Sequence, residues 1–107
     1  MLNKQLLTAM ILILMLAAGG VQAGGDVARG QELASGDCVD CHGDDGLGDE
    51  DTPAIAGMDP AKHVKELAAF KSGERADEEE NMIYSVEELS EQDMADLAAY
   101  YASLPGK

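Results

Sequence analysis

Cys38-Val39-Asp40-Cys41-His42 is the stretch that decides the fold of this chain. Two cysteines three positions apart, followed directly by a histidine, form the attachment pattern of a c-type haem. Thiols one helical turn apart can each add to a vinyl group of the same macrocycle, so Cys38 and Cys41 are predicted to form thioethers. His42 would then lie under the ring, where an imidazole nitrogen can bind the iron.

Three other interpretations of the two cysteines compete with haem attachment. A redox dithiol of the thioredoxin type belongs to a βαβ pattern, which this sequence lacks. A zinc site needs further ligands, and the chain has two cysteines and no second ligand pair at a suitable spacing. A structural disulfide between the two cysteines is possible if the chain is exported, because disulfides form in oxidising compartments. Haem attachment also requires export, so the N-terminus bears on the choice.

The first 23 residues have the pattern of a secretory signal peptide. Lys4 supplies the positive charge, residues 6–18 form an apolar run, and Val21-Gln22-Ala23 gives a small-residue cleavage pattern. The run is short of the roughly 20 residues that a membrane span needs, although an uncleaved anchor is the alternative. We therefore expect cleavage after Ala23, a domain of residues 24–107, a periplasmic location and no stable membrane insertion after cleavage.

The composition is strongly acidic, with 21 Asp and Glu against 7 Lys and Arg and a net charge of −14. Such a chain is repelled by nucleic acids and by anionic membranes, so neither is expected as a partner. A redox partner with a basic docking surface would be attracted instead. The alternative is that the acidic surface serves solubility alone.

Aromatic residues are scarce: the chain has one Phe, three Tyr and no Trp. A small domain buries a modest fraction of its surface and usually needs a cofactor or a covalent link to be stable. A covalently bound haem would supply the missing core, and we expect little stable structure without it.

The periodicity of apolar residues predicts a first helix over 27–35 and a second over 60–71. Asp26 and Asp59 are the expected N-caps, and Pro60 suits the first position of the second helix. The residues expected to face inward are Val27, Leu33 and Ala34 in the first helix and Val64, Leu67 and Ala68 in the second. His63 lies next to the second set and is expected at the surface or its boundary rather than on the iron.

A last helix is predicted to begin after Ser90, with Asp93 as the partner in a capping box. Its expected inner residues are Met94, Leu97, Ala98 and Tyr101. Residues 43–53 are rich in glycine and acids and predict a solvated loop, since the ligand order of an EF-hand is missing. Residues 74–81 predict a polar connector, and 82–86 are apolar but too short and irregular to assign. The sequence thus predicts an all-α domain.

Taken together, these residues resemble the small class I cytochromes c, nearest the cytochrome c553 and cytochrome c4 type of domain. The resemblance covers nearly all of residues 24–107. It is carried by residues 30–33 (GQEL), 38–43 (CVDCHG), 53–57 (PAIAG), 67–73 (LAAFKSG) and 89–101 (LSEQDMADLAAYY).

The resemblance implies a small cytochrome c fold, with three main helices wrapped around one covalently bound haem c. It implies that the first and last helices cross near Gly30, with Tyr100 or Leu97 as the partner. It also implies that Pro53 lies on the histidine side of the haem, where its carbonyl can accept the proton of the other nitrogen of His42 and orient the ring.

The sixth iron ligand decides the function, and the candidates after residue 23 are Met58, Met82 and Met94. Met94 belongs to the inner face of the last helix, and Met58 follows Pro53 on the histidine side, so packing accounts for both. In the resembled family the ligand methionine lies seven positions before the leucine that opens the last motif. Counting back from Leu89 gives Met82; the alternative is a packing methionine with water or another ligand on the iron.

These residues predict a monohaem electron carrier with His42 and Met82 as axial ligands and no catalytic chemistry of its own. The alternative is the haem subunit of a periplasmic oxidoreductase, for example a sulfur-compound or alcohol dehydrogenase. Nothing in the sequence resembles a substrate pocket, a flavin motif or a catalytic acid–base pair, which favours the carrier. A thioether ligand raises the haem potential and blocks access to the iron, as a carrier requires.

Overall fold

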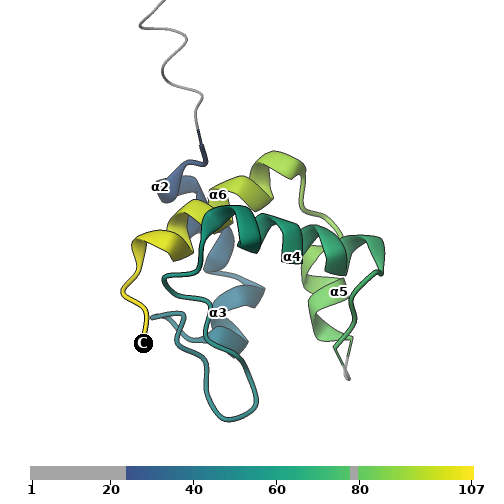
Figure 1. Ribbon diagram of the computed structural model, residues 1–107, viewed down its shortest axis with the longest axis horizontal. Helices are drawn as coiled ribbons and strands as arrows, with labels where there is room; N and C mark the ends of the chain where they lie inside the picture. Colours follow the sequence, from purple (N-terminus) through teal and green to yellow (C-terminus); the bar gives the residue numbers. More distant parts are fainter. Residues whose placement is uncertain (1–23, 78–79) are drawn as a thin grey trace, which may run out of the picture.

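The computed structural model describes residues 24–77 and 80–107. These residues form helices and no strands, and the helices are α2 (Val27–Ala34), α3 (Asp37–His42), α4 (Pro60–Ser72), α5 (Asn81–Val86) and α6 (Glu91–Ser103) (Figure 1). The all-α prediction is confirmed, and the short helices α3 and α5 join the three that were expected. The predicted signal peptide, 1–23, and residues 78–79 of the predicted connector lie outside the described residues. In the described part of the chain, no helix has the length and apolar character that crossing a membrane requires.

Helix α2 begins where the sequence predicted, because the Asp26 side chain accepts a hydrogen bond from the backbone N–H of Arg29 at 3.1 Å. Its buried residues are Gly30 and Ala34, and Leu33 packs partly against the core. The expectation that Val27 faces inward is wrong, since Val27 is 45% exposed in the first turn. The face that meets the rest of the protein is therefore built from very small residues.

The small residues of α2 let it cross α6 at close range. A Cβ placed on Gly30 would lie 2.0 Å from the carbonyl oxygen of Asp96 and 2.8 Å from the Cβ of Tyr100. The predicted contact of Gly30 with Tyr100 is thus confirmed, and the backbone of Asp96 is closer still. Glycine is required here by the approach of another backbone rather than by its own dihedral angles.

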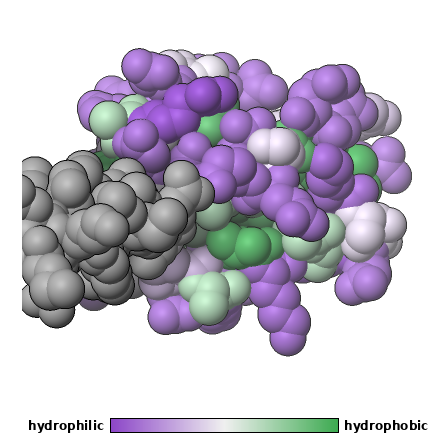
Figure 2. Space-filling model, turned by 90° about the horizontal axis from the view of Figure 1, so that it is seen from above, coloured by the Kyte–Doolittle hydropathy of each residue, from purple (hydrophilic) through white to green (hydrophobic). Residues whose placement is uncertain are grey.

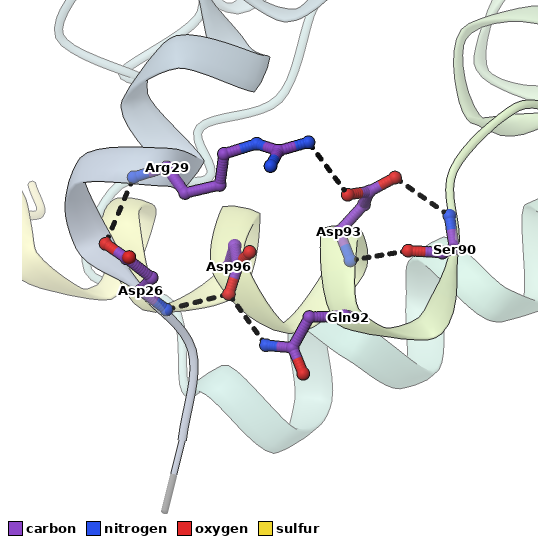
Figure 3. Close-up of polar contacts among 6 residues, drawn as sticks. All are labelled: Asp26, Arg29, Ser90, Gln92, Asp93 and Asp96. Atoms are coloured by element: carbon purple, nitrogen blue, oxygen red, sulfur yellow. Dashed lines mark hydrogen bonds and ion pairs between the residues drawn. The ribbon is translucent and has the colours of Figure 1, made fainter. Parts of the chain in front are cut away.

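Polar contacts fix the same crossing (Figure 3). The backbone N–H of Asp26 donates to Asp96 Oδ1 at 2.7 Å, and Gln92 Nε2 donates to the same oxygen at 2.9 Å. Arg29 of α2 forms an ion pair with Asp93 of α6 at 3.5 Å. The two helices are therefore joined by a buried carboxylate as well as by packing.

Helix α6 begins with the predicted capping box, in which Ser90 and Asp93 each accept the other's backbone N–H at 3.0 Å. All four predicted inner residues of α6 are buried, and Asp96 and Tyr100 are buried with them. The core of the described residues consists of Ala34, Leu67, Phe70, Val86, Met94, Leu97, Tyr100 and Tyr101. Half of these residues come from α6, which is the central helix of the fold.

Helix α4 has its predicted N-cap at Asp59, which accepts from the N–H of Lys62 at 3.0 Å, and it ends at Gly73 in the left-handed conformation. Its buried face differs from the predicted one. The buried residues are His63, Leu67 and Phe70, whereas Ala68 is exposed and Val64 is half-buried. The helix is turned so that a histidine faces α6, where the ring of His63 contacts that of Tyr101.

Helix α5 covers the segment for which the sequence indicated no regular structure. The side chain of Asp77 accepts the N–H of Asn81 at 3.1 Å and that of Met82 at 3.2 Å, so the first turn is capped from upstream. Val86 at the other end is buried in the core. Figure 1 shows α3 and α5 on the same side of α4, well separated from each other along its length.

Candidate functional site

Helix α3 consists of the haem-attachment pattern and little else. It begins at Asp37 after Gly36, which offers no side-chain cap, and ends at His42 with Gly43 at φ 85°. Cys38 is half-buried and packs against the core, Cys41 is exposed, and both are free thiols. The structural-disulfide interpretation is not supported by this geometry.

The electrostatics of Cys38 also differ from those of a redox dithiol or a metal thiolate. Burial, and secondly the neighbouring Asp37 carboxylate, raise the pKa of the Cys38 thiol above its ordinary value. Reactive and metal-binding cysteines show the opposite shift, because both uses require the thiolate. Among residues 24–77 and 80–107, no group of three or more His, Cys, Asp and Glu could hold a metal ion.

His42 is buried, and one of its ring nitrogens is already engaged. Its Nδ1 lies 2.9 Å from the carbonyl oxygen of Pro53, the partner that was expected from sequence. Since a carbonyl can only accept, Nδ1 carries the proton and donates. In the neutral imidazole with this tautomer, Nε2 has a lone pair for a metal, the arrangement found for most ligating histidines.

The loop between α3 and α4 places the Pro53 carbonyl. The N–H of Gly48 donates to the carbonyl of His42 at 2.8 Å, and Gly48 has a φ of 66°. A Cβ there would lie 2.1 Å from the carbonyl oxygen of Thr52 and 2.7 Å from that of Pro53. Asp49 Oδ1 accepts the N–H groups of Asp51 and Thr52, both at 2.9 Å. The acids of this loop include one that closes a turn, in keeping with the predicted solvated loop.

Of the three methionines considered as ligands, Met82 is the one on α5. It is half-buried and packs against the edge of the core. Met94 is buried within the core on α6, as expected for a packing residue, and Met58 is half-buried in the loop after Pro53. His42 and Met82 therefore come from the two short helices that lie apart on one side of α4 (Figure 1).

These residues fit a covalently bound haem. Two free thiols are one turn apart on one helix, next to a buried imidazole whose free nitrogen is Nε2. Two neutral ligands, an imidazole and a thioether, are the axial set of cytochromes c. The donor set thus matches haem c better than it matches zinc or a dithiol.

Two buried residues close to this site were not predicted to belong to it. His63 was expected at the surface or its boundary, which is wrong, and Tyr101 was expected only as an inner residue of the last helix, which is confirmed. Both are buried, and their ring centroids are 5.6 Å apart. Each has a polar atom with no hydrogen-bond partner among the described residues, namely His63 Nδ1 and the Tyr101 hydroxyl oxygen. His63, Leu67 and Phe70 have the spacing of one helical face, so the sequence did contain a signal for this face. The aliphatic set with Val64 and Ala68 was preferred because it is more apolar.

Comparison of the sequence with known proteins shows a consistent set of relatives. The family model described as Cytochrome c matches residues 27–105. Cytochrome c-554(547) of Halothiobacillus neapolitanus is 36% identical over 89 residues, which cover 75% of this chain and 98% of that protein. Cytochrome c4 of Pseudomonas aeruginosa is 40% identical over 103 residues, which cover 95% of this chain and 49% of that protein. The chain thus spans nearly all of the first relative and about half of the second.

Comparison of the structure gives the same picture. The crystal structure of reduced recombinant cytochrome c4 from Pseudomonas stutzeri has a TM-score of 0.70 at 24% identity, a likeness of fold that covers 77% of this chain and 52% of that one. Thiosulfate dehydrogenase (TsdBA) from Marichromatium purpuratum has a TM-score of 0.65 at 31% identity, over 74% of this chain and 19% of that one.

Proposed function

This chain belongs to the cytochrome c family and carries one covalently bound haem c, and on that premise we propose that it is a periplasmic electron carrier with His42 and Met82 as its axial ligands. The family supports electron transfer as the general activity. Two claims go beyond the family assignment and are part of the proposal: that the protein acts as a free carrier, and that His42 and Met82 are the two ligands. The haem iron supplies the redox change between the ferric and ferrous states.

We assign Cys38 and Cys41 to the two thioether links and His42 to the histidine side of the iron. The observation that carries this assignment is the 2.9 Å contact between His42 Nδ1 and the Pro53 carbonyl. It fixes the tautomer and the plane of the ring before any metal is present, and it increases the basicity of the nitrogen that faces the iron. Pro53 acts through its backbone oxygen, held by the turn at Gly48.

Met82 is proposed as the ligand on the opposite side. It lies on α5, and Figure 1 shows α5 on the same side of α4 as α3, the helix with the attachment residues. The capping of α5 by Asp77 orders the backbone at Met82 itself. A methionine ligand would raise the reduction potential and keep other molecules from the iron, which a carrier needs.

The test of this proposal compares Met82→Ala with Met58→Ala in holoprotein matured in a bacterial periplasm. Met82→Ala should lower the reduction potential markedly and let the reduced haem bind carbon monoxide, with a strong spectral change. Met58→Ala, which removes an equally half-buried methionine, should do neither. An unchanged potential in Met82→Ala, or carbon monoxide binding by the unmodified protein, would mean that another group or no group holds the sixth position.

A second candidate function is suggested by the thiosulfate dehydrogenase structure, in which a similar domain accounts for 19% of the matched chain. In that case this chain would be the electron-accepting haem subunit of an enzyme. The two functions differ in a simple assay. If this chain is a free carrier, the purified protein should not oxidise thiosulfate, whether or not its redox partner is present. If it is an enzyme subunit, it should purify from its native extract in a complex that oxidises the substrate.

The proposed location and partners follow from sequence and surface. Residues 1–23 have the pattern of a signal peptide, and mass spectrometry of the secreted protein would test cleavage after Ala23. Figure 2 shows a largely hydrophilic face with a small hydrophobic area at its centre. With 21 acidic and 7 basic residues, docking to a basic partner should be steered by charge. Tyr84, exposed by 63% two positions after Met82, offers apolar contact area beside the site.

A further inference from the structure

His63 of α4 and Tyr101 of α6 meet in the interior of the described protein. His63 is 4% exposed and Tyr101 is 1% exposed. Their ring centroids are 5.6 Å apart, with the planes tilted by 50°. A buried histidine and a buried tyrosine in contact are unusual in a core that is otherwise almost entirely apolar.

Both side chains bring a polar atom into this core without a partner among the described residues. The atoms are Nδ1 of His63 and the hydroxyl oxygen of Tyr101. Native proteins leave very few such groups unsatisfied, because an unpaired polar group in a low-dielectric interior is costly. The two atoms are not hydrogen-bonded to each other in this structure. They are chemically complementary, since a tyrosine hydroxyl can donate and a neutral imidazole nitrogen can accept.

The position of Tyr101 is set tightly by its neighbours. A Cβ on Gly46 would lie 3.0 Å from Tyr101 Cδ1, so the loop after α3 presses against the edge of the ring. On another side the ring of Tyr100 makes an edge contact at 5.0 Å. The carbonyl of Tyr101 accepts the N–H of Gly57 at 2.8 Å. The hydroxyl is therefore directed by packing from the loops as well as by its own helix.

The direction is toward the residues that hold the haem. Cys38 packs against the core that contains Tyr101, so the tyrosine lies near the proposed position of the first thioether. In keeping with this, burial raises the pKa of Tyr101, with the neighbouring Cys38 thiol as the next cause. Burial also lowers the pKa of His63, Glu66 opposes this shift, and the His42 imidazole adds to it. The pair thus lies on the side of the core that faces α3.

We propose that His63 and Tyr101 are hydrogen-bonded to each other in the haem-bound protein, directly or across one ordered water, and that this pair lowers the reduction potential of the haem below that of an apolar lining. In the direct form the tyrosine hydroxyl donates to Nδ1 of a neutral His63, and the proton of the imidazole lies on Nε2. In the bridging form one buried water would accept from the Tyr101 hydroxyl and donate to Nδ1 of His63.

The effect on the potential has a simple electrostatic reason. Oxidation adds a positive charge at the iron, and a polar group nearby stabilises that charge better than a hydrocarbon does. Tyr101 belongs to the core against which Cys38 packs, and Cys38 would be linked covalently to the macrocycle. Both residues act through the haem environment and are tuning rather than catalytic residues.

The experiment is a double-mutant cycle on holoprotein, with Tyr101→Phe, His63→Leu and the combination. Each single variant should raise the reduction potential, and the double variant should raise it by less than the sum, because the first change already breaks the pair. His63→Gln keeps an acceptor and should restore much of the potential. Tyr100→Phe, the adjacent tyrosine on the same helix, should leave the potential unchanged. Strictly additive shifts, or a shift in Tyr100→Phe as large as in Tyr101→Phe, would overturn the proposal.

Thermal unfolding gives a second measurement, which shows whether the hydroxyl of Tyr101 is hydrogen-bonded or unpaired. Removing a paired hydroxyl lowers the midpoint of unfolding, whereas removing an unpaired buried one raises it. We expect Tyr101→Phe to lower the midpoint, and a raised midpoint would contradict the pairing. The proposal depends on haem attachment at Cys38 and not on Met82, whose bond to the iron is monitored separately by the methionine–iron charge-transfer band of the ferric protein.

Discussion

The carbonyl oxygen of Asp96 occupies the space that a side chain on Gly30 would need, 2.0 Å from the ideal Cβ position. Gly30→Ala must therefore push α2 away from α6, at a cost of about 1–3 kcal/mol for overpacking. Alanine is intrinsically the better helix former by up to ~1 kcal/mol, which alone would raise the free energy of unfolding. A lower free energy of unfolding must therefore come from the helix crossing. We expect a lower free energy of unfolding in chemical denaturation of the holoprotein. Gln31→Ala, at the exposed next position of α2, is the control and should be neutral or slightly stabilising.

Asp96 should make stability depend on pH in an acidic window. The N–H of Asp26, then Gln92, holds the pKa of this carboxyl below its ordinary value of 3.8. The unfolded chain therefore binds more protons in the range between the two pKa values, and the contribution of Asp96 is lost as the pH falls through the folded pKa. Asp96→Asn should cost about 1–3 kcal/mol at neutral pH. The difference between the two proteins should shrink below about pH 4, near the unfolded pKa.

Unfolding curves of the two proteins at several pH values check this prediction. Glu91→Gln removes the same charge from an exposed position of the same helix, and it should show no such window. A constant difference between the parent and Asp96→Asn down to pH 2 would contradict the role given to the carboxylate.

Gly48→Ala should disturb the support of His42. Its Cβ would lie 2.1 Å from the carbonyl oxygen of Thr52 and 2.7 Å from that of Pro53, which accepts from His42. Displacing this acceptor makes His42 less basic, which destabilises the ferric state. We expect a raised reduction potential together with reduced stability, both measurable on the purified holoprotein.

Gly73→Ala is the matched control for Gly48→Ala. Gly73 also has a positive φ, 82°, but a Cβ there meets nothing within 4 Å. Both variants lose about 1–2 kcal/mol of stability for the left-handed conformation. Gly48→Ala should lose more, because only its Cβ meets the carbonyl groups of Thr52 and Pro53, and only Gly48→Ala should change the potential. Equal potentials in the two variants would show that Pro53 does not influence the iron.

The protein lacking its haem should have little fixed tertiary structure. The described core is small and depends on α6 for half of its residues, while α3 and α5 are each six residues long. Isolated helices of that length are not stable in water. We expect a Cys38→Ala/Cys41→Ala protein to show weak near-ultraviolet circular dichroism and no cooperative thermal transition, in contrast to the holoprotein. A cooperative transition in the haem-free variant would contradict this expectation.

The sequence predicted the features that local chemistry determines. Asp26, Asp59 and Ser90 cap the helices that they were expected to cap, because capping depends on residues within one turn. The contact of His42 with the Pro53 carbonyl was also expected, although from a family resemblance rather than from any local pattern.

What the sequence did not reveal depends on distant contacts. The buried face of α4 was placed on Val64 and Ala68 instead of His63 and Phe70, because hydropathy favours aliphatic residues and the partner ring of Tyr101 comes from another helix. Helix α5 was not assigned, because its first turn is capped by Asp77 from outside the helix.

The hydrogen bond from the N–H of Asp26 to Asp96 joins positions 70 residues apart, so it can form only after a long segment of the chain has been brought together. Closing a loop over that span costs conformational entropy, and this cost is offset only when α6 has formed and packs against α2. Until then the small-residue face of α2 at Gly30 has no partner, so α2 gains little stability from packing before α6 forms. The crossing of α2 and α6 is thus a non-local contact, and contacts of this kind slow folding because the loop between them must close first.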